Sequence, residues 1–307
     1  MKILLTGATG QVGREVQRRS KILGLTVIPT SRETLDIGDK AQTTSIFEHE
    51  DFDLIINAAA YTAVDKAESD RETAFRVNAD GVEHLAILAN QHAIPLFHIS
   101  TDYVFDGETT VAYKETATTN PQTVYGASKL QGEQRLKETV AAHIILRTSW
   151  VFGTDGNNFV KTMLRLGEAN DTLSVVADQL GNPTFAGSIA NALLSLAVQY
   201  REKGHLEWGV YHFSDSSTAT WHSFAKQIIK CGHKHGLIRV LPVVNPISTA
   251  DYPTTAQRPS YSSLDTSLFA TTFPKVEIKD WQEGLEHMML TLSPVSYTHL
   301  TLPTKRI

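Results

Sequence analysis

Three glycines near the start of the chain constrain its fold more than any other feature. Gly7, Gly10 and Gly13 follow the apolar run from Ile3 to Leu5 and open a stretch with helical periodicity. Glycine suits such a turn because the turn needs backbone angles that a side chain would hinder. A strand that enters a helix in this way presents free backbone N–H groups to a phosphate. The pattern predicts a dinucleotide cradle, and the alternative is a tight strand-to-helix turn without a ligand.

Strand-like and helix-like segments alternate through the first half of the chain. The apolar runs expected to form buried strands cover residues 3–5, 25–29, 54–57, 95–100 and 143–147. Helical periodicity is expected over residues 11–23, 70–92 and the segment after residue 121. This alternation predicts an α/β fold with a Rossmann-like doubly wound parallel sheet.

Composition excludes several classes of function. The 307 residues are 41% hydrophobic and 20% charged, with a formal net charge of -5 and no long run of one sign. No apolar stretch approaches the roughly 20 residues of a membrane helix. We therefore expect no nucleic-acid partner, no membrane partner and, since no signal peptide is evident, a cytoplasmic location. The single cysteine, Cys231, is expected to be a small buried side chain rather than a nucleophile.

The residues after the second expected strand bear on the choice of cofactor. An acidic side chain there would bind the ribose hydroxyls of NAD, whereas a basic one suits the extra phosphate of NADP. This chain has Ser31 and Arg32, which favours NADPH without excluding NADH. The alternative for Arg32 is a solvated surface charge. Asp36 and Ile37 are expected to line the adenine side.

Tyr125, Lys129 and Thr101 are the candidate catalytic residues. Four positions along a helix bring a phenol and an ammonium to one face, where the ammonium is expected to lower the phenol's pKa. Thr101 ends its strand, where open α/β sheets bind ligands, and its hydroxyl can donate to a substrate carbonyl. A Tyr-x-x-x-Lys spacing alone is more often a surface pair. Its combination with Thr101 and the glycine turn predicts acid catalysis of carbonyl reduction.

Longer strings across the chain resemble a known family, the extended short-chain dehydrogenases and reductases. The resembling segments are residues 5–13, 57–68, 100–107, 124–126 with Lys129, 147–151, 156–159, 178–184 and 258–259. Within that family they are most similar to enzymes that reduce nucleotide-linked keto sugars. The resemblance implies NAD(P)H-dependent reduction of the C4 ketone of dTDP-4-dehydro-β-L-rhamnose to dTDP-L-rhamnose.

The resemblance also implies roles for individual residues. Tyr125 would be the proton donor, Lys129 its electrostatic partner and ribose anchor, and Thr101 a donor to the carbonyl. The residues implied to meet the cofactor pyrophosphate or line its far side are Gly10, Gln11, Val12, Ala60, Tyr61 and Thr62. The residues implied to face the substrate are Thr101, Asp102, Trp150 and Arg258. Trp150 is equally consistent with core packing and Arg258 with a structural salt bridge. Asn57 is expected to hydrogen-bond locally and position the cofactor loop.

The expected domain organisation follows from the same pattern. Residues 1–150 are predicted to form the NADP-binding Rossmann domain, with later segments such as 172–200 returning to it. Residues 151–292 are predicted to form mainly a smaller C-terminal α+β substrate domain, with mostly loop over 245–259. Residues 293–307 lack periodicity and are expected to be a non-native or disordered tail.

Metal binding and oligomerisation are only weakly constrained. Some family members are described as Mg²⁺-dependent dimers held through acidic clusters. Glu15 fits such a cluster, but Ser188 stands where a carboxylate partner is expected. We expect no Mg²⁺ at the catalytic site and leave a homodimer open. His233 and His235 alternate without metal-ligand spacing and are expected to face solvent.

Two alternatives to the reductase remain open at this point. The first is another nucleotide-sugar enzyme of the family, an epimerase or a dehydratase, which would retain NAD through a closed cycle. The second is a non-catalytic binding module resembling the regulatory subunit of methionine adenosyltransferase. The presence of Thr101, Tyr125 and Lys129 favours an enzyme.

Overall fold

A six-stranded parallel sheet forms the centre of the larger lobe. The computed structural model describes residues 1–293, so residues 294–307 of the predicted tail lie outside the described residues. The strands lie in the order β10-β5-β4-β3-β1-β2 and all pair in parallel. Their bounds are β1 Lys2–Thr6, β2 Thr26–Pro29, β3 Leu54–Asn57, β4 Leu96–Thr101, β5 His143–Thr148 and β10 Gly209–His212.

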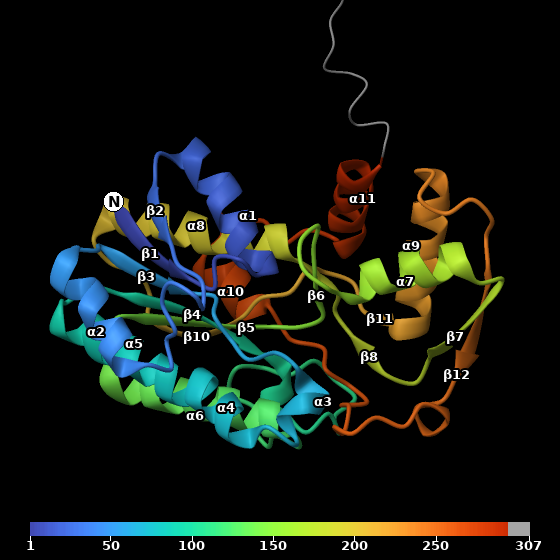
Figure 1. The fold of residues 1–307 in the computed structure, drawn as a ribbon, viewed down its shortest axis with the longest axis horizontal. Helices are drawn as coiled ribbons and strands as arrows, with labels where there is room; N and C mark the ends of the chain where they lie inside the picture. Colours follow the sequence, from blue (N-terminus) through green and yellow to red (C-terminus); the bar gives the residue numbers. More distant parts are fainter. Residues whose placement is uncertain (294–307) are drawn as a thin grey trace, which may run out of the picture.

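Helices cover both faces of this sheet, which confirms the predicted Rossmann-like α/β fold (Figure 1). One face carries α1 Gln11–Ser20, α8 Ala186–Lys203 and α10 Ser267–Thr272. The other face carries α2 Lys40–His49, α5 Gly81–Gln91 and α6 Val124–Thr139. In β1, Ile3 and Leu5 pack into the apolar core that α1 and α8 cover, and Leu4 packs into the apolar core that α2 and α5 cover. Each strand is therefore apolar on both sides, as a doubly covered sheet requires.

A smaller lobe lies beyond the carboxyl ends of the strands (Figure 1). Its helices are α7 Phe159–Ala169, α9 Trp221–Lys234 and α11 Trp281–Leu292. They enclose a separate apolar core that includes Phe224, Ile228 and Leu285. Three two-stranded sheets complete it: β6 Val151–Phe152 with β9 Thr184–Phe185, β7 Thr172–Val176 with β12 Val243–Ile247, and β8 Leu180–Gly181 with β11 Ala219–Thr220.

The chain passes between the two lobes repeatedly. After β7 and β8 in the smaller lobe, α8 returns to the large sheet and packs against α1. β10 then adds the edge strand beside β5, and α10 packs against β10 before α11 closes the smaller lobe. Residues 186–203 of the predicted returning segment thus lie on the sheet, whereas β7 belongs to the smaller lobe.

Two expectations about local structure hold overall but differ in detail. Residues 245–259 are mostly loop, as predicted, although residues 245–247 belong to β12, which pairs in parallel with β7. This strand is largely exposed and contains Pro246, which an edge of a two-stranded sheet tolerates. The helix expected over 70–92 is divided into α4 Arg71–Phe75, a π-turn over Arg76–Asp80, and α5.

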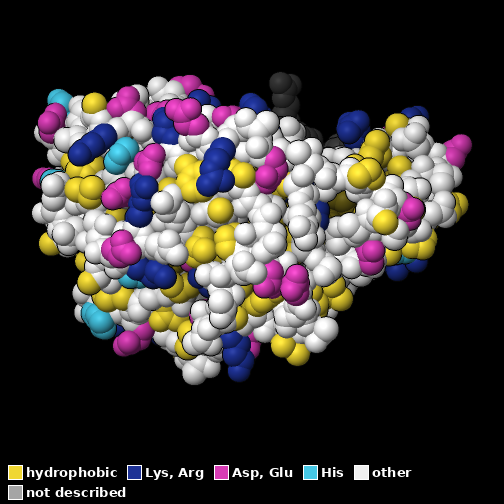
Figure 2. Space-filling view, turned by 90° about the horizontal axis from the view of Figure 1, so that it is seen from below, with side chains coloured by type: hydrophobic (Ala, Val, Ile, Leu, Met, Phe, Trp, Pro, Cys, Tyr) yellow, Lys and Arg dark blue, Asp and Glu magenta, His cyan; other side chains and the backbone are white. Residues whose placement is uncertain are grey.

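The surface shows no extended field of one charge on the face drawn in Figure 2, where basic and acidic side chains are interspersed. Among residues 1–293, no helix combines the length and apolarity needed to cross a bilayer.

Candidate active site

The strand order creates a binding position beside β1. From β1 the chain crosses to β2 on one side, and β3 then pairs on the other side of β1. Ligands bind at such a switch point, outside the carboxyl ends of the strands. A cleft of about 500 Å³ and an adjoining hollow of about 220 Å³ open there. The two share Gly10 and the loop of residues 58–60.

The glycine turn after β1 fits a pyrophosphate. Gly7 has a left-handed φ of +67°, and a Cβ there would lie 2.4 Å from the carbonyl oxygen of Ala58. A Cβ on Gly13 would lie 2.3 Å from the carbonyl oxygen of Gly7, so α1 crosses the turn too closely for a side chain. A Cβ on Gly10 would meet only Gly7 and otherwise project into open space. The first turn of α1 has no acidic residue, which leaves its positive end open to an anion.

The smaller hollow gathers the residues predicted to hold the adenosine half of a dinucleotide. Gly7, Arg32, Asp36, Ile37 and Tyr61 all line it. Arg32 is exposed and, among the described residues, makes no salt bridge within 4 Å, whereas the Asp36 carboxylate accepts from Arg76 at 2.9 Å. The hollow therefore has one guanidinium available to an additional phosphate.

Ser31 lies beside Arg32 but does not line the hollow. Its hydroxyl donates to the Glu33 carboxylate at 2.5 Å, and this hydrogen bond lowers the pKa of Glu33. The structure therefore directs Ser31 toward Glu33 rather than toward the hollow.

The larger cleft brings the three candidate catalytic residues together. Thr101 ends β4, and Tyr125 and Lys129 lie on the first turns of α6; all three line the cleft. The helix begins where the Thr123 hydroxyl accepts from the Gly126 N–H at 3.0 Å. Gln11, Val12, Ala60 and Thr62 line the same cleft, so the predicted cofactor and catalytic residues share one space.

The expected effect of Lys129 on Tyr125 is not what the structure shows. Burial raises the pKa of the Tyr125 phenol above its usual value, and the Asp102 and Tyr103 side chains add to this. A hydrogen bond with Thr101 acts in the opposite direction. The phenol thus stays protonated at neutral pH in the described structure, because removal from water disfavours its charged form.

Lys129 is held by groups behind the cleft. Its side chain is almost fully buried, and its Nζ donates to the Ile99 carbonyl at 2.7 Å and lies 3.1 Å from His98 Nε2. Burial lowers the pKa of this amine to about 8, opposed by the Glu133 carboxylate.

Asn57 makes the local hydrogen bonds expected of it. Its Oδ1 accepts from the Ala59 N–H at 3.1 Å and from the Thr6 hydroxyl at 2.6 Å. Its Nδ2 lies 3.0 Å from His98 Nδ1. Asn57 therefore anchors the loop after β3 and links it to His98, a residue that the sequence analysis did not single out.

Asn78 is a second positioning residue that the sequence analysis missed. It lies in the π-turn between α4 and α5, a distortion often found at functional sites. Its Oδ1 accepts from the Tyr61 N–H at 2.8 Å, and its Nδ2 donates to the Tyr61 carbonyl at 3.0 Å and to Ser128 at 3.0 Å. Asn78 thus ties the cofactor loop to α6.

Asp102 places a buried carboxylate at the cleft. Its Oδ1 accepts from the Thr101 hydroxyl at 3.0 Å, but the buried Oδ2 has no hydrogen-bond partner among the described residues. Burial raises the pKa of Asp102 to about 6. An unsatisfied buried oxygen that lines a cleft is suited to accept from a ligand hydroxyl.

Asp102→Asn should change the pH dependence of stability. The folded pKa lies above the ordinary value of 3.8, so the wild type loses stability as pH rises between about 4 and 6. Relative to the wild type, the variant should gain up to about 3 kcal/mol in the free energy of unfolding across that window, and the gain should then level off. Urea unfolding at several pH values measures it. The exposed Asp51→Asn variant is the control, and parallel profiles for Asp102→Asn and the wild type would contradict the raised pKa.

Trp150 joins the smaller lobe to the cleft. Its indole stacks on Trp221 at 3.5 Å between ring centroids and donates to the Ser262 hydroxyl at 3.2 Å. Trp150 also lines the cleft. Trp150 therefore fits both predicted roles, because it packs between the lobes and also offers a flat surface at the site.

Three predicted site residues do not line the cleft or the hollow: Gly13, Ser31 and Arg258. Gly13 shapes the turn from behind. Arg258 forms an ion pair with Asp65 and donates to the Tyr103 hydroxyl at 3.2 Å, which matches the salt-bridge alternative. Glu15, the residue considered for an acidic cluster, is buried and paired with Arg18 and Arg19.

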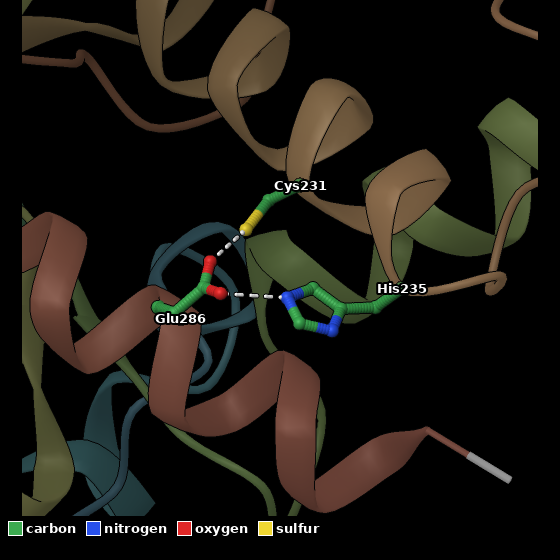
Figure 3. Close-up of side chains that lie close together, drawn as sticks. All are labelled: Cys231, His235 and Glu286. Carbon is green, nitrogen blue, oxygen red and sulfur yellow. Dashed lines mark hydrogen bonds and ion pairs between the residues drawn. The ribbon is translucent and has the colours of Figure 1, made fainter. Parts of the chain in front are cut away.

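A second cluster of polar side chains lies between α9 and α11 (Figure 3). Glu286 accepts from the Cys231 thiol at 3.0 Å and is bonded to His235 Nε2 at 2.8 Å. The expectation that His235 faces solvent is therefore wrong, although His233 is exposed. The Lys234 ammonium also binds Glu286, at 2.7 Å, and burial raises the pKa of Cys231 to about 12. These contacts account for the cluster as a link between two helices.

Known proteins resemble this chain over nearly its whole length. The family model described as RmlD substrate binding domain matches residues 1–293. A dTDP-4-dehydrorhamnose reductase of Aggregatibacter actinomycetemcomitans is 43% identical over 288 residues, covering 94% of this chain and 98% of that protein. The crystal structure of such a reductase from Clostridium acetobutylicum gives a TM-score of 0.88 at 37% identity, covering 95% and 99% of the two chains. The Bacillus anthracis reductase, solved in complex with NADP, gives 0.87 at 35% identity, covering 94% and 99%.

The parallel sheet, the glycine turn at its switch point and the Thr-Tyr-Lys cleft define an extended short-chain dehydrogenase or reductase, as the sequence predicted. A sequence identity of 43% over 94% of this chain narrows the assignment to one family of reductases. The chain belongs to the dTDP-4-dehydrorhamnose reductase family.

Proposed function

We propose that this protein reduces the C4 ketone of dTDP-4-dehydro-β-L-rhamnose to dTDP-L-rhamnose with NADPH. One observation carries the proposal: Thr101, Tyr125 and Lys129 line a cleft that continues past Gly10 into a hollow lined by Arg32. A hydroxyl, a phenol and an amine thus share one space with the dinucleotide cradle. The relatives described above are named as reductases of dTDP-4-dehydrorhamnose, and the Bacillus anthracis reductase was solved with NADP.

The cofactor would be held by groups that the structure already orients. Gly10, Gln11 and Val12 would meet the pyrophosphate at the N-terminus of α1, and Arg32 would meet the additional phosphate. Ala60 and Thr62 would line its course, and Lys129 would anchor the ribose. When bound, NADPH supplies the hydride.

Tyr125 would donate the proton to the substrate oxygen. A reduction needs a protonated acid at the start, and burial keeps this phenol protonated at neutral pH. The Thr101 hydroxyl, which donates to Asp102 Oδ1 in the described structure, would turn to donate to the same oxygen as negative charge develops there. After the transfer, the Lys129 ammonium would stabilise the phenolate.

The substrate would be oriented by the other groups that face the cleft. Asp102 Oδ2 is free to accept from a sugar hydroxyl, and the Trp150 indole offers a flat face to a ring. Arg258 would act indirectly, since it holds Tyr103 and Asp65 rather than lining the cleft.

An assay that measures both the cofactor and the sugar tests the proposal and its alternatives. Purified protein mixed with NADPH and dTDP-4-dehydrorhamnose should consume NADPH and form dTDP-L-rhamnose in equal amounts, as measured by absorbance and chromatography. Conversion of the sugar without net NADPH loss would indicate an epimerase or dehydratase. Cofactor binding without any conversion would indicate a binding module.

Arg32→Ala should weaken NADPH binding by about 10- to 100-fold, because a hydrogen bond to a charged group contributes about 1.5–3 kcal/mol. NADH lacks the additional phosphate, so its dissociation constant should hardly change. Fluorescence titration with both cofactors measures the difference. The control Arg165→Ala removes an exposed arginine of α7 that lines neither the cleft nor the hollow. An equal loss for both cofactors would show that Arg32 does not contact the phosphate.

The cytoplasmic location stays a prediction from the sequence, and a homodimer stays open.

A further inference from the structure

His98 lies behind the cleft, between the cofactor loop and α6. It belongs to β4, its side chain is fully buried, and it lines neither the cleft nor the hollow. One ring nitrogen faces Asn57 at 3.0 Å and the other faces the Lys129 amine at 3.1 Å. A single imidazole therefore connects the end of β3 with the amine on α6.

The hydrogen bonds around Asn57 fix which groups donate and which accept in this network. The Ala59 N–H can only donate, so the atom of Asn57 that it meets is the carbonyl oxygen. The amide nitrogen of Asn57 must then donate to His98 Nδ1. Burial lowers the pKa of His98 well below its usual value, so the ring is neutral. A neutral imidazole that accepts at Nδ1 carries its proton on Nε2.

The Nε2 proton points at Lys129. An ammonium has three donors and no acceptor, so it cannot pair with an N–H. The uncharged amine can accept from His98 Nε2 while it donates to the Ile99 carbonyl. The orientation of this network therefore favours the uncharged form of Lys129.

Other charged or titratable groups near Lys129 have to be weighed against His98. Glu133, one turn further along α6, favours the ammonium, but its carboxylate is bound by Arg147 at 2.6 Å and by the Ser100 hydroxyl at 2.5 Å. Among the described residues, Asp102 and Tyr125 line the same cleft as the amine. Of these groups in the described part of the chain, His98 is the one that lies within hydrogen-bonding distance of the amine nitrogen, at 3.1 Å.

We propose that His98 is a positioning residue that holds the Lys129 amine through its Nε2–H and sets the pH at which Lys129 gains its charge. Asn57 fixes the required tautomer, so the loop after β3 and the charge of Lys129 are coupled. The Lys129 amine then titrates near pH 8, below the ordinary lysine value.

Nuclear magnetic resonance on the full chain tests this inference without relying on turnover. The ¹³Cε shift of Lys129, assigned by comparison with Lys129→Met, should titrate with a midpoint near pH 8 in the wild type. In His98→Gln, an amide oxygen can accept from the ammonium, so the midpoint should rise by about one unit or more. The control is His143→Gln, which replaces another buried histidine, on β5, that is hydrogen-bonded to Val140. An unchanged midpoint in His98→Gln would overturn the inference.

The tautomer provides a test that needs no variant. ¹⁵N spectra of the wild-type histidines recorded at about pH 9, above the Lys129 midpoint, should show His98 neutral, with its proton on Nε2. A proton on Nδ1, or a charged ring at that pH, would contradict the direction of the network and overturn the inference even if His98→Gln fails to fold.

The consequence for catalysis rests on the proposed function. If the ammonium stabilises the Tyr125 phenolate, kcat should fall as pH rises through the Lys129 midpoint, and this decline should move to higher pH in His98→Gln. A wild type that does not oxidise NADPH would refute the proposed function and leave the titration result standing. An active His98→Gln enzyme with an unmoved pH profile and midpoint would refute the inference alone.

Discussion

Tyr125→Phe should lower kcat by about 10²- to 10⁴-fold, the range that a positioned general acid contributes. The change removes only the hydroxyl that would protonate the substrate oxygen, and the ring keeps its edge contact with Tyr103. NADPH affinity should therefore change little, because the cradle at Gly10 is untouched. Steady-state assays with a cofactor titration separate the two quantities.

A matched control for that loss is Tyr211→Phe. Tyr211 is also buried, but its hydroxyl donates to the Glu207 carbonyl at 2.8 Å, away from the cleft. This variant should retain wild-type kcat. Equal rates for Tyr125→Phe and the wild type would remove Tyr125 from the role of acid.

Gly13→Ala should impair both folding and cofactor binding. Its methyl group would lie 2.3 Å from the Gly7 carbonyl oxygen and 2.7 Å from Ala8 Cα, and both are backbone atoms. Forcing α1 away from the turn should cost about 1–3 kcal/mol in the free energy of unfolding. NADPH binding should weaken by at least about 10-fold, since the turn orients the N–H groups of α1. Chemical denaturation and fluorescence titration measure the two effects.

Gly10→Ala should separate these effects. Its methyl group would approach only the Gly7 carbonyl oxygen, at 3.3 Å, and would project where the cleft and the hollow meet. Stability should stay near that of the wild type while NADPH affinity falls. Unchanged cofactor affinity in both variants would show that the dinucleotide does not lie on this turn.

The parts of the site that follow from sequence are those built by local spacing. The Gly7 turn and the Tyr125–Lys129 pair lie within single supersecondary units, so their geometry follows from chain periodicity. The strands of the sheet were predictable because both of their faces are apolar. β12 was not, because it is exposed and lacks an alternating pattern.

The residues whose roles or surroundings sequence reasoning missed depend on partners far along the chain. His98 acquires its role from Asn57 and Lys129, which lie 41 and 31 positions away. His235 is held by Glu286, 51 positions away. The pKa of Tyr125 was misjudged because burial raises it, and burial is a property of the assembled fold.

The repeated passage of the backbone between the lobes determines how the molecule can be divided. A fragment ending near residue 150 would lack β10 at the sheet edge and α8 over α1, and so would expose the part of the core that Leu193 and Phe213 cover in the whole chain. The complementary fragment would carry those elements with nothing to cover them. We therefore expect the two halves to be insoluble when expressed separately, to complement each other when co-expressed, and to denature as one cooperative unit.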